Sequence, residues 1–223
     1  MGIYLPDLSD WYNNEHVPLR LNHLPSFLTG ARFSASDGKL PGWLAVYDID
    51  DTATFQHESY TRLRATRSPR EGDLVKRLEL LDRRTYELSY DSGESKKTSS
   101  FKSTDPTKVI VTYGITLEDG QIDGWVAEVK EKLPSVDGWI RTRAYLCIDS
   151  LKSGVGVPEG PEAQKVPKYL IIHGEYQVTS AGVLDDGSIK GALSAPGVDE
   201  VRIWDLYRAY PCVAQGNLGA HST

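Results

Sequence analysis

The sequence repeats a set of landmarks in the same order, and this repeat constrains the fold more than any other feature of the 223-residue chain. The matched segments are a helix end followed by a strand at 24–33 and 133–145, a second strand at 42–47 and 168–173, and a last strand at 84–88 and 202–206. The partners lie roughly 110 to 125 residues apart, and four landmarks in one order at similar spacing indicate an internal duplication.

Each half reads as helix, strand, strand, helix, strand, and the second half opens with one strand more. Residues 109–113 form a short run rich in β-branched side chains, which is typical of a strand, whereas residues 122–133 carry apolar side chains at helical spacing. The second half is therefore β-α-β-β-α-β, the order of a ferredoxin-like unit.

These repeats predict an α+β fold and a domain organisation. A ferredoxin-like unit has helices on one face of an antiparallel sheet, so the open faces of two units can close against each other within one chain, as an intrachain dimeric α+β barrel. The expected segments are an N-terminal repeat at 1–90, a solvated Ser-, Thr-, Lys- and Gly-rich linker at 91–107, a C-terminal repeat at 108–213 and a flexible tail at 214–223.

The first repeat departs from this pattern at its start. Only residues 1–6 precede the first predicted helix, which is too few for a full strand. We expect an exposed sheet edge there, covered by residues 3–5, by the C-terminal tail or by another molecule. Because exposed edges pair with other chains, a homodimer is favoured.

Composition and charge exclude several classes of function. The net charge is −6 and basic residues are interleaved with acids, which argues against a nucleic-acid partner. No run approaches the ~18 apolar residues of a membrane span and no secretory leader is recognisable, so we expect a cytoplasmic protein with no membrane partner. Cys147 and Cys212 are expected as buried reduced thiols, and no metal- or nucleotide-binding pattern predicts a metal or other cofactor.

Chemically active side chains are concentrated at residues 12–20, Tyr-Asn-Asn-Glu-His-Val-Pro-Leu-Arg. Four-residue helical steps place Tyr12 above His16 and His16 above Arg20, so a phenol, an imidazole and a guanidinium share one stripe. Such groups can move protons and offset negative charge, which predicts the edge of an active site. Packing is the alternative, because tyrosines at helical spacing and single histidines are commonly core residues.

The same stretch resembles the first helix of the fungal EthD-like proteins of the dimeric α+β barrel superfamily, which carries Trp-Tyr, Glu-His and Pro-Leu-Arg. The run at 202–211 and the Gly-Pro-Glu-Ala-Gln-Lys-Val-Pro loop also resemble that family, so the likeness covers nearly the whole chain. It implies a barrel that acts without cofactors through His, Tyr and Arg, with His16 at the ligand cavity.

Strand alternation predicts which side chains line the barrel. Trp43, Ala45 and Tyr47 form a larger and more amphipathic set than Leu44 and Val46, so we assign the aromatic set to the barrel interior and the aliphatic set to the helix layer.

The repeat transfers this assignment to the second half. Tyr169, His173 and Glu175 then face the same cavity, with His173 equivalent to Tyr47, and Trp204 is a further candidate. Stacking rings and proton-carrying groups suit a flat, oxygenated aromatic molecule. For His173 a satisfied, buried position is the alternative.

The first functional hypothesis is a cofactor-independent lyase or isomerase of secondary metabolism. It would act by proton transfer on an aromatic or polyketide-like small molecule, as a cyclase, isomerase, dehydratase or decarboxylase. By the resemblance, His16 is the acid or base, Tyr12 or Tyr47 orients a substrate oxygen, Arg20 offsets negative charge and His173 is a second proton carrier. The residues assigned to substrate binding are Trp43, Tyr169, Glu175 and Trp204.

Two alternatives stay open. One is a non-catalytic or stress-related barrel that binds a hydrophobic small molecule. The other is a haem-binding barrel with His173 as axial ligand, although the motifs of the haem members are absent.

Overall fold

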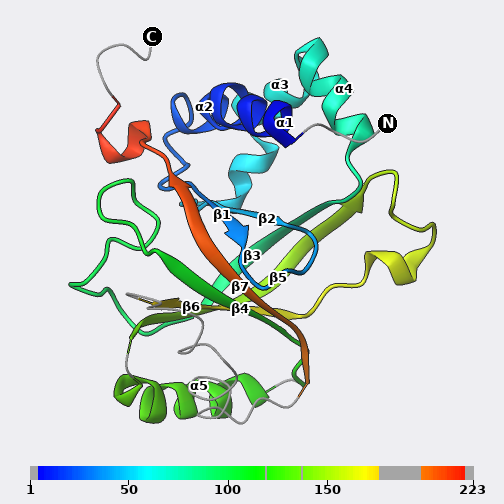
Figure 1. Ribbon diagram of the computed structural model, residues 1–223. Coiled ribbons are helices and arrows are strands. Elements are labelled where there is room, and N and C mark those ends of the chain that lie inside the picture. The colour runs from blue at the N-terminus through cyan, green and yellow to red at the C-terminus, as the bar shows by residue number, and fades with distance from the viewer. Residues whose placement is uncertain (1–4, 119, 137, 176–196, 219–223) are drawn as a thin grey trace.

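A computed structural model describes residues 5–118, 120–136, 138–175 and 197–218, without the side chains of residues 5–7 and 175. The fold is mixed, with one curled antiparallel sheet and few helices. The sheet crosses the middle of the molecule, with helices α1 to α4 on one side and α5 on the other (Figure 1).

The sheet has seven strands in the order β2-β1-β7-β4-β6-β5-β3, and every neighbouring pair is antiparallel. The strands are β1 (Ala31–Ala35), β2 (Trp43–Val46), β3 (Leu81–Asp91), β4 (Val109–Ile115), β5 (Trp139–Ser153), β6 (Tyr169–Glu175) and β7 (Val198–Ala209). The β1–β7 and β3–β5 pairs join the two halves of the chain, so the halves share one sheet. β4 is paired on both sides, and all seven of its residues are buried, which explains its apolar, β-branched composition.

The helices are α1 (Leu5–Trp11), a π-helical turn η1 (Tyr12–His16), α2 (Pro18–Leu21), α3 (Glu58–Ala65), α4 (Pro69–Arg77) and α5 (Gln121–Lys132). Short 3-10 turns occupy Thr52–Gln56, Leu133–Ser135, Pro161–Gln164 and Val213–Gln215. The predicted helix at 122–133 and the predicted strand at 109–113 are thus confirmed as α5 and β4.

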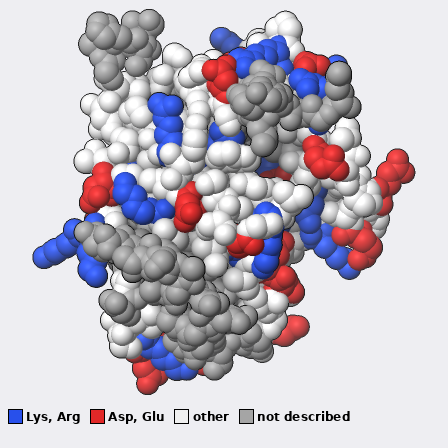
Figure 2. Space-filling model, viewed as in Figure 1, with Lys and Arg blue, Asp and Glu red and all other residues white. Residues whose placement is uncertain are grey.

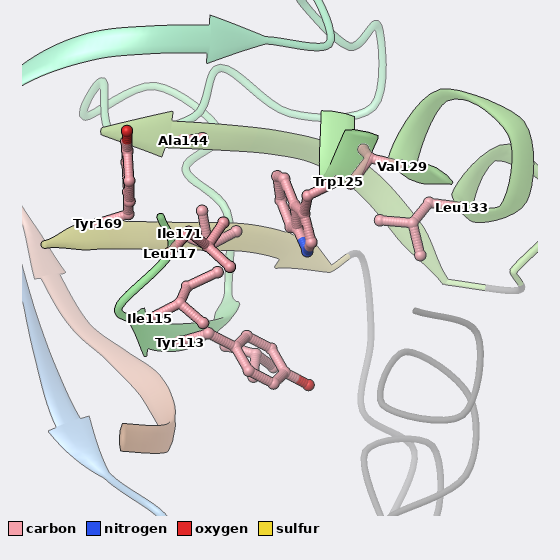
Figure 3. Packing of buried hydrophobic residues seen from close by; sticks show 10 residues of the cluster. Tyr113, Ile115, Leu117, Trp125, Val129, Leu133, Ala144, Tyr169 and Ile171 are labelled. Carbon is pink, nitrogen blue, oxygen red and sulfur yellow. The ribbon is translucent and has the colours of Figure 1, made fainter. Parts of the chain in front are cut away.

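Three apolar clusters fill the fold. The first lies between the sheet and α5, and its labelled members include Trp125, Tyr169 and Ile171 (Figure 3). The second lies beneath the N-terminal helices. The third, which we call the concave cluster, takes side chains from six of the seven strands, among them Leu44, Trp204 and, from β5, Tyr145. A sheet whose strands from β2 to β5 share one cluster must be curled around it.

The linker is ordered against the sheet, which corrects the solvated segment expected at 91–107. Phe101 is 2% exposed and belongs to the concave cluster, where its ring lies edge-on to Phe33 with centroids 5.8 Å apart. The loop closes through backbone hydrogen bonds from Thr107 to Ser100 and from Ser99 to Asp105, each 2.9 Å. Phe101 and these hydrogen bonds together anchor the segment.

The first residues of the expected flexible tail are also held in place. The Gln215 amide donates to the Leu28 carbonyl at 3.2 Å, and the Asn217 amide donates to the Ser103 hydroxyl. The tail is therefore tied to the body at least as far as Asn217. Residues 219–223 lie outside the described residues.

Candidate functional site

The helix that carries Tyr12 and His16 changes its hydrogen-bond pattern at the candidate site. The Val17 amide donates to the Tyr12 carbonyl at 3.0 Å, a five-residue step that makes η1 a π-helical turn. Pro18 follows at once and has no amide proton for a four-residue bond, so the widened turn avoids the clash that proline causes inside an α-helix. Single π-turns of this kind occur frequently at functional sites.

His16 lies in an aromatic setting with one side open. Its ring stacks on Tyr12 at 4.9 Å between centroids and is tilted against Trp11 at 4.7 Å. One fifth of the side chain (20%) is exposed, yet Nδ1 is buried and has no hydrogen-bond partner. The side chain is therefore mostly buried and keeps a small exposed part away from Nδ1.

A buried carboxylate lies opposite that nitrogen. Glu71 on α4 is 4% exposed, and its Oε1 is 3.9 Å from His16 Nδ1 and 3.5 Å from Arg67 Nε. α4 is anchored by the Ser68 hydroxyl, which accepts from the Glu71 amide at 3.0 Å and donates to the Glu15 carboxylate. A capping bond thus holds the carboxylate against the histidine.

Burial and nearby cations both disfavour a charged His16 ring. Burial lowers the pKa of His16 well below its ordinary value, and the guanidinium groups of Arg20, Arg67 and Arg32 lower it further. Arg20 is fixed by a 2.6 Å hydrogen bond from Nη1 to the His16 carbonyl. Burial also raises the pKa of Glu71, although Arg20 and Arg67 oppose that rise. At neutral pH the imidazole is therefore uncharged.

The hydroxyl groups of Tyr12 and Tyr47 meet at 3.0 Å. Burial raises the pKa of Tyr12, and it raises that of Tyr47 well above the ordinary value. Both phenols are protonated at neutral pH and can donate hydrogen bonds. The structure thus unites Tyr12, His16, Arg20 and Tyr47 of the predicted site.

Arg32 on β1 is a member of this site that the sequence analysis missed. Its side chain is buried, with the guanidinium 4.0 Å from the Trp43 ring centroid, 4.6 Å from that of Tyr12 and 5.5 Å from that of Tyr207. Nη1 has no hydrogen-bond partner. The signal was a cation between two apolar residues of a short strand, Ala31 and Phe33, both buried on the opposite face.

Glu71 and Arg67 were missed as well. Their signal was the Ser-Pro-Arg-Glu sequence at 68–71, which has the spacing of a helix cap with a glutamate in the first turn. This sequence predicts where α4 begins. It does not predict that the glutamate lies against the helix that carries His16.

The predicted assignment of strand faces is wrong. Leu44 and Val46 pack in the concave cluster, whereas Tyr47 packs beneath the N-terminal helices. Trp43 lies with Arg32 on the helix side. On the helix side the Tyr47 hydroxyl bonds to that of Tyr12 and the Trp43 ring lies against the Arg32 guanidinium, whereas aliphatic side chains fill the concave face.

The second half shows the same inversion. Tyr169 and Ile171 belong to the apolar cluster that packs against α5 (Figure 3), and the rings of His173 and Trp125 of that helix are 6.3 Å apart between centroids. The predicted cavity shared by Trp43, Tyr47, Tyr169, His173 and Trp204 is therefore not formed, because Tyr47, Tyr169 and Trp204 belong to three different clusters and His173 lies beside Trp125. Trp204 does lie in the concave cluster.

His173 is fully buried, whereas His16 is partly exposed. Its Nδ1 is 2.7 Å from the Thr142 hydroxyl, and burial lowers its pKa to about 3. Glu175 ends β6, but its side chain lies outside the described residues. The expectation that this carboxylate tunes His173 therefore stays a prediction.

A polar pocket lies away from His16, at the linker. Its lining includes Phe101, Thr107, Arg141 and Arg143. Both arginines already have carboxylate partners, Asp91 for Arg141 and Asp48 for Arg143, so the pocket offers no free cation.

Comparison with known proteins identifies the fold. No family model and no curated protein matches the sequence. An anthrone oxidase-like protein of known structure superposes with a TM-score of 0.52 at 11% identity, over 99% of this chain and 92% of that one. A proposed monooxygenase from Lactobacillus acidophilus gives a TM-score of 0.40 at 11% identity, over 93% and 90% of the two chains. At this identity the first likeness shows the fold alone, which is that of the dimeric α+β barrels.

Two surface properties complete the description. None of the described helices is both long and apolar enough to cross a lipid bilayer. Lysine and arginine are interspersed with aspartate and glutamate on the face seen in Figure 2. That face has no extended positive surface of the kind that binds a nucleic-acid backbone.

Proposed function

We propose that the protein is an enzyme that removes a proton from an oxygenated aromatic small molecule, with His16 as the base. The observation that carries the proposal is an uncharged, partly exposed imidazole near three guanidinium groups. Its free lone pair is available to a proton at neutral pH, and although burial and the cations disfavour the imidazolium, the same cations would stabilise the anion that proton removal leaves behind.

The neighbours of His16 suggest how the step would proceed. Nδ1 faces Glu71, so a proton on Nδ1 leaves the lone pair on Nε2. Nε2 then takes a proton from an acidic C–H or O–H group, and the electron pair of that bond stays on the substrate as an enolate or phenolate. Tyr12 donates a hydrogen bond to the substrate oxygen, and Arg20 and Arg32 offset its charge.

The structural neighbour suggests a probe. Its name refers to anthrone, a tricyclic aromatic ketone whose carbon-bound protons are acidic. If His16 is a base for such compounds, the wild-type protein will exchange these protons for deuterium in D2O faster than buffer does, which NMR can follow. His16→Ala should lower the exchange rate by roughly 10² to 10⁴, the usual contribution of one proton-transfer group.

Matched variants make this experiment decisive. His23 is exposed, so His23→Gln should exchange anthrone at the wild-type rate. His16→Gln replaces the alanine variant if the latter unfolds. Full exchange by a folded His16→Gln protein would contradict the proposal. Oxygen uptake in an aerated sample would show whether the anion goes on to react with O2.

A non-catalytic binding protein is the second candidate. It is favoured by the close packing of Trp11, Tyr12 and His16, with ring centroids 4.7 to 5.7 Å apart. A compound that binds, or that mass spectrometry finds retained by the purified protein, but shows neither exchange nor turnover would support this function.

We also propose that the chain is a tandem pair of ferredoxin-like repeats, with boundaries at 1–90 and 108–213, related to the EthD-like proteins. The strand order β7-β4-β6-β5 supports this for the second half, because it places that half's first strand between its last and its third. In the first half, β1, β2 and β3 correspond to the second, third and fourth strands of such a unit.

A further inference from the structure

The two edges of the sheet run in the same direction. Every neighbouring pair is antiparallel and the number of strands is seven, so β2 and β3 at the two ends are parallel to each other. An antiparallel sheet with an odd number of strands cannot close on itself by antiparallel pairing. One additional strand, antiparallel to both β2 and β3, would close it into an eight-stranded barrel.

The open edge of β2 has free backbone groups. The Ala35 amide donates to the Gly42 carbonyl at 2.9 Å, and bonded pairs alternate along an antiparallel ladder. Leu44 and Val46 therefore bond to β1, and the amides of Trp43 and Ala45 point outward. Among the residues that the structure describes, no backbone bond joins β2 to β3.

The concave side of this gap is apolar. Leu44 and Val46 pack at the edge of the concave cluster and stay only partly buried. Across the gap, Leu88 on β3 is 56% exposed and pairs with Tyr145, which packs against that cluster. A sheet edge that stays in contact with solvent usually avoids an exposed leucine.

We propose that β2 and β3 form the two sides of a slot that binds one extended β-strand from another polypeptide. The strand would run antiparallel to both edges and bring five to seven residues, apolar or β-branched and without proline. β4 supports this chemistry, because it takes up the matching place in the second half, between β7 and β6, and has the sequence Val-Ile-Val-Thr-Tyr-Gly-Ile.

A labelled peptide with the sequence of residues 108–116 is the probe for this slot. Fluorescence anisotropy should show saturable binding to the full chain, at least tenfold tighter than that of a peptide with proline at its second and fourth strand positions. Hydrogen exchange should slow by at least tenfold in β2 and in β3 together when the peptide is bound.

Two variants test the geometry. Ala45→Pro removes an outward amide without removing a β1–β2 bond, so it should keep the melting temperature within a few degrees and weaken peptide binding at least tenfold. Leu88→Glu, at an exposed position, should do the same by placing a charge in the slot, and it keeps the test open if the proline variant misfolds.

Three results would overturn the proposal. Binding no tighter than that of the proline peptide would show that the edges do not accept a strand. Protection of β2 or β3 alone would show that they are not two sides of one slot. Slow exchange of both strands before peptide is added, or a dimer in sedimentation that the peptide does not compete with, would show that other residues of the chain or a second copy already cover the edges.

Discussion

Nδ1 of His16 is a buried nitrogen without a partner, and such a group costs about 1 to 3 kcal/mol of stability. Glu71 does not supply the missing hydrogen bond, because its Oε1 is 3.9 Å from Nδ1, beyond hydrogen-bonding distance. A catalytic histidine tolerates this because its hydrogen bonds often tighten only when substrate binds. We therefore expect His16 and Glu71 to move together on ligand binding.

The Tyr12–Tyr47 hydroxyl pair gives the first prediction at the scale of residues. Tyr12→Phe leaves the Tyr47 hydroxyl buried without its partner, so it should lower the free energy of unfolding by roughly 1 to 3 kcal/mol. Replacing both by phenylalanine removes both groups and should cost less than the sum of the single changes. Urea denaturation of the four proteins measures the difference. Additive losses would show that the hydroxyl groups do not interact.

His173 gives a prediction about pH. Its pKa in the folded protein is about 3, below the ordinary value of about 6.5, so the unfolded chain binds the proton first as the pH falls. The stability due to the neutral ring is complete above pH 6.5 and is lost on acidification, by roughly 3 kcal/mol at pH 4. His173→Gln should be less stable at pH 7 but should show a shallower loss between pH 6.5 and 4. Equal slopes in urea titrations would contradict the buried, neutral assignment.

At the scale of elements, alternation along a strand was predictable but the inward face was not. The pattern separates Trp43, Ala45 and Tyr47 from Leu44 and Val46 without saying which set meets a helix. The helix-side partner of Tyr47 is Tyr12, on an element remote in sequence. Arg32 was missed for a similar reason, since its three aromatic neighbours come from three different elements.

Elements with a strong periodic or compositional signal were predicted well. α5 and β4 follow from their apolar spacing, and the rings of Tyr12 and His16 do stack, with the Arg20 guanidinium bonded to the His16 carbonyl. The linker was misjudged because composition averages over residues. Its single phenylalanine, in a run rich in serine and threonine, decides where the loop lies.

Phe101 gives the prediction at the scale of elements. Phe101→Ala removes a ring that is 2% exposed in the concave cluster, so it should lower the free energy of unfolding by about 3 to 5 kcal/mol. Lys102→Ala is the matched control because Lys102 is exposed and next in the sequence. Chemical denaturation compares the two. A loss below about 1 kcal/mol for Phe101→Ala would mean that the loop is not part of the core.

At the scale of the whole molecule, the sheet organises both halves of the chain. Among the residues that the structure describes, its central strands β7, β4 and β6 are paired on both sides, whereas β2 and β3 are paired on one side only. The strand order of the second half agrees with the ferredoxin-like repeat that we propose.

Native-state hydrogen exchange should reflect this arrangement. We expect the slowest amides in β4 and β6, since these open only with global unfolding, and the fastest strand amides at the outward positions Trp43 and Ala45 of β2. Peptide-resolved mass spectrometry at several denaturant concentrations would rank them. Slow exchange in β2 equal to that in β4 would contradict a sheet that ends there.

The measurement that tests the account most directly is an NMR titration of the His16 imidazole. A His16→Gln sample assigns the signals. We predict that the His16 resonances stay at their neutral positions well below pH 6.5, because burial and the guanidinium groups of Arg20, Arg67 and Arg32 disfavour the charged ring. A His16 midpoint at or above about 6.5, the ordinary value for histidine, would contradict the lowered pKa and the proposed site.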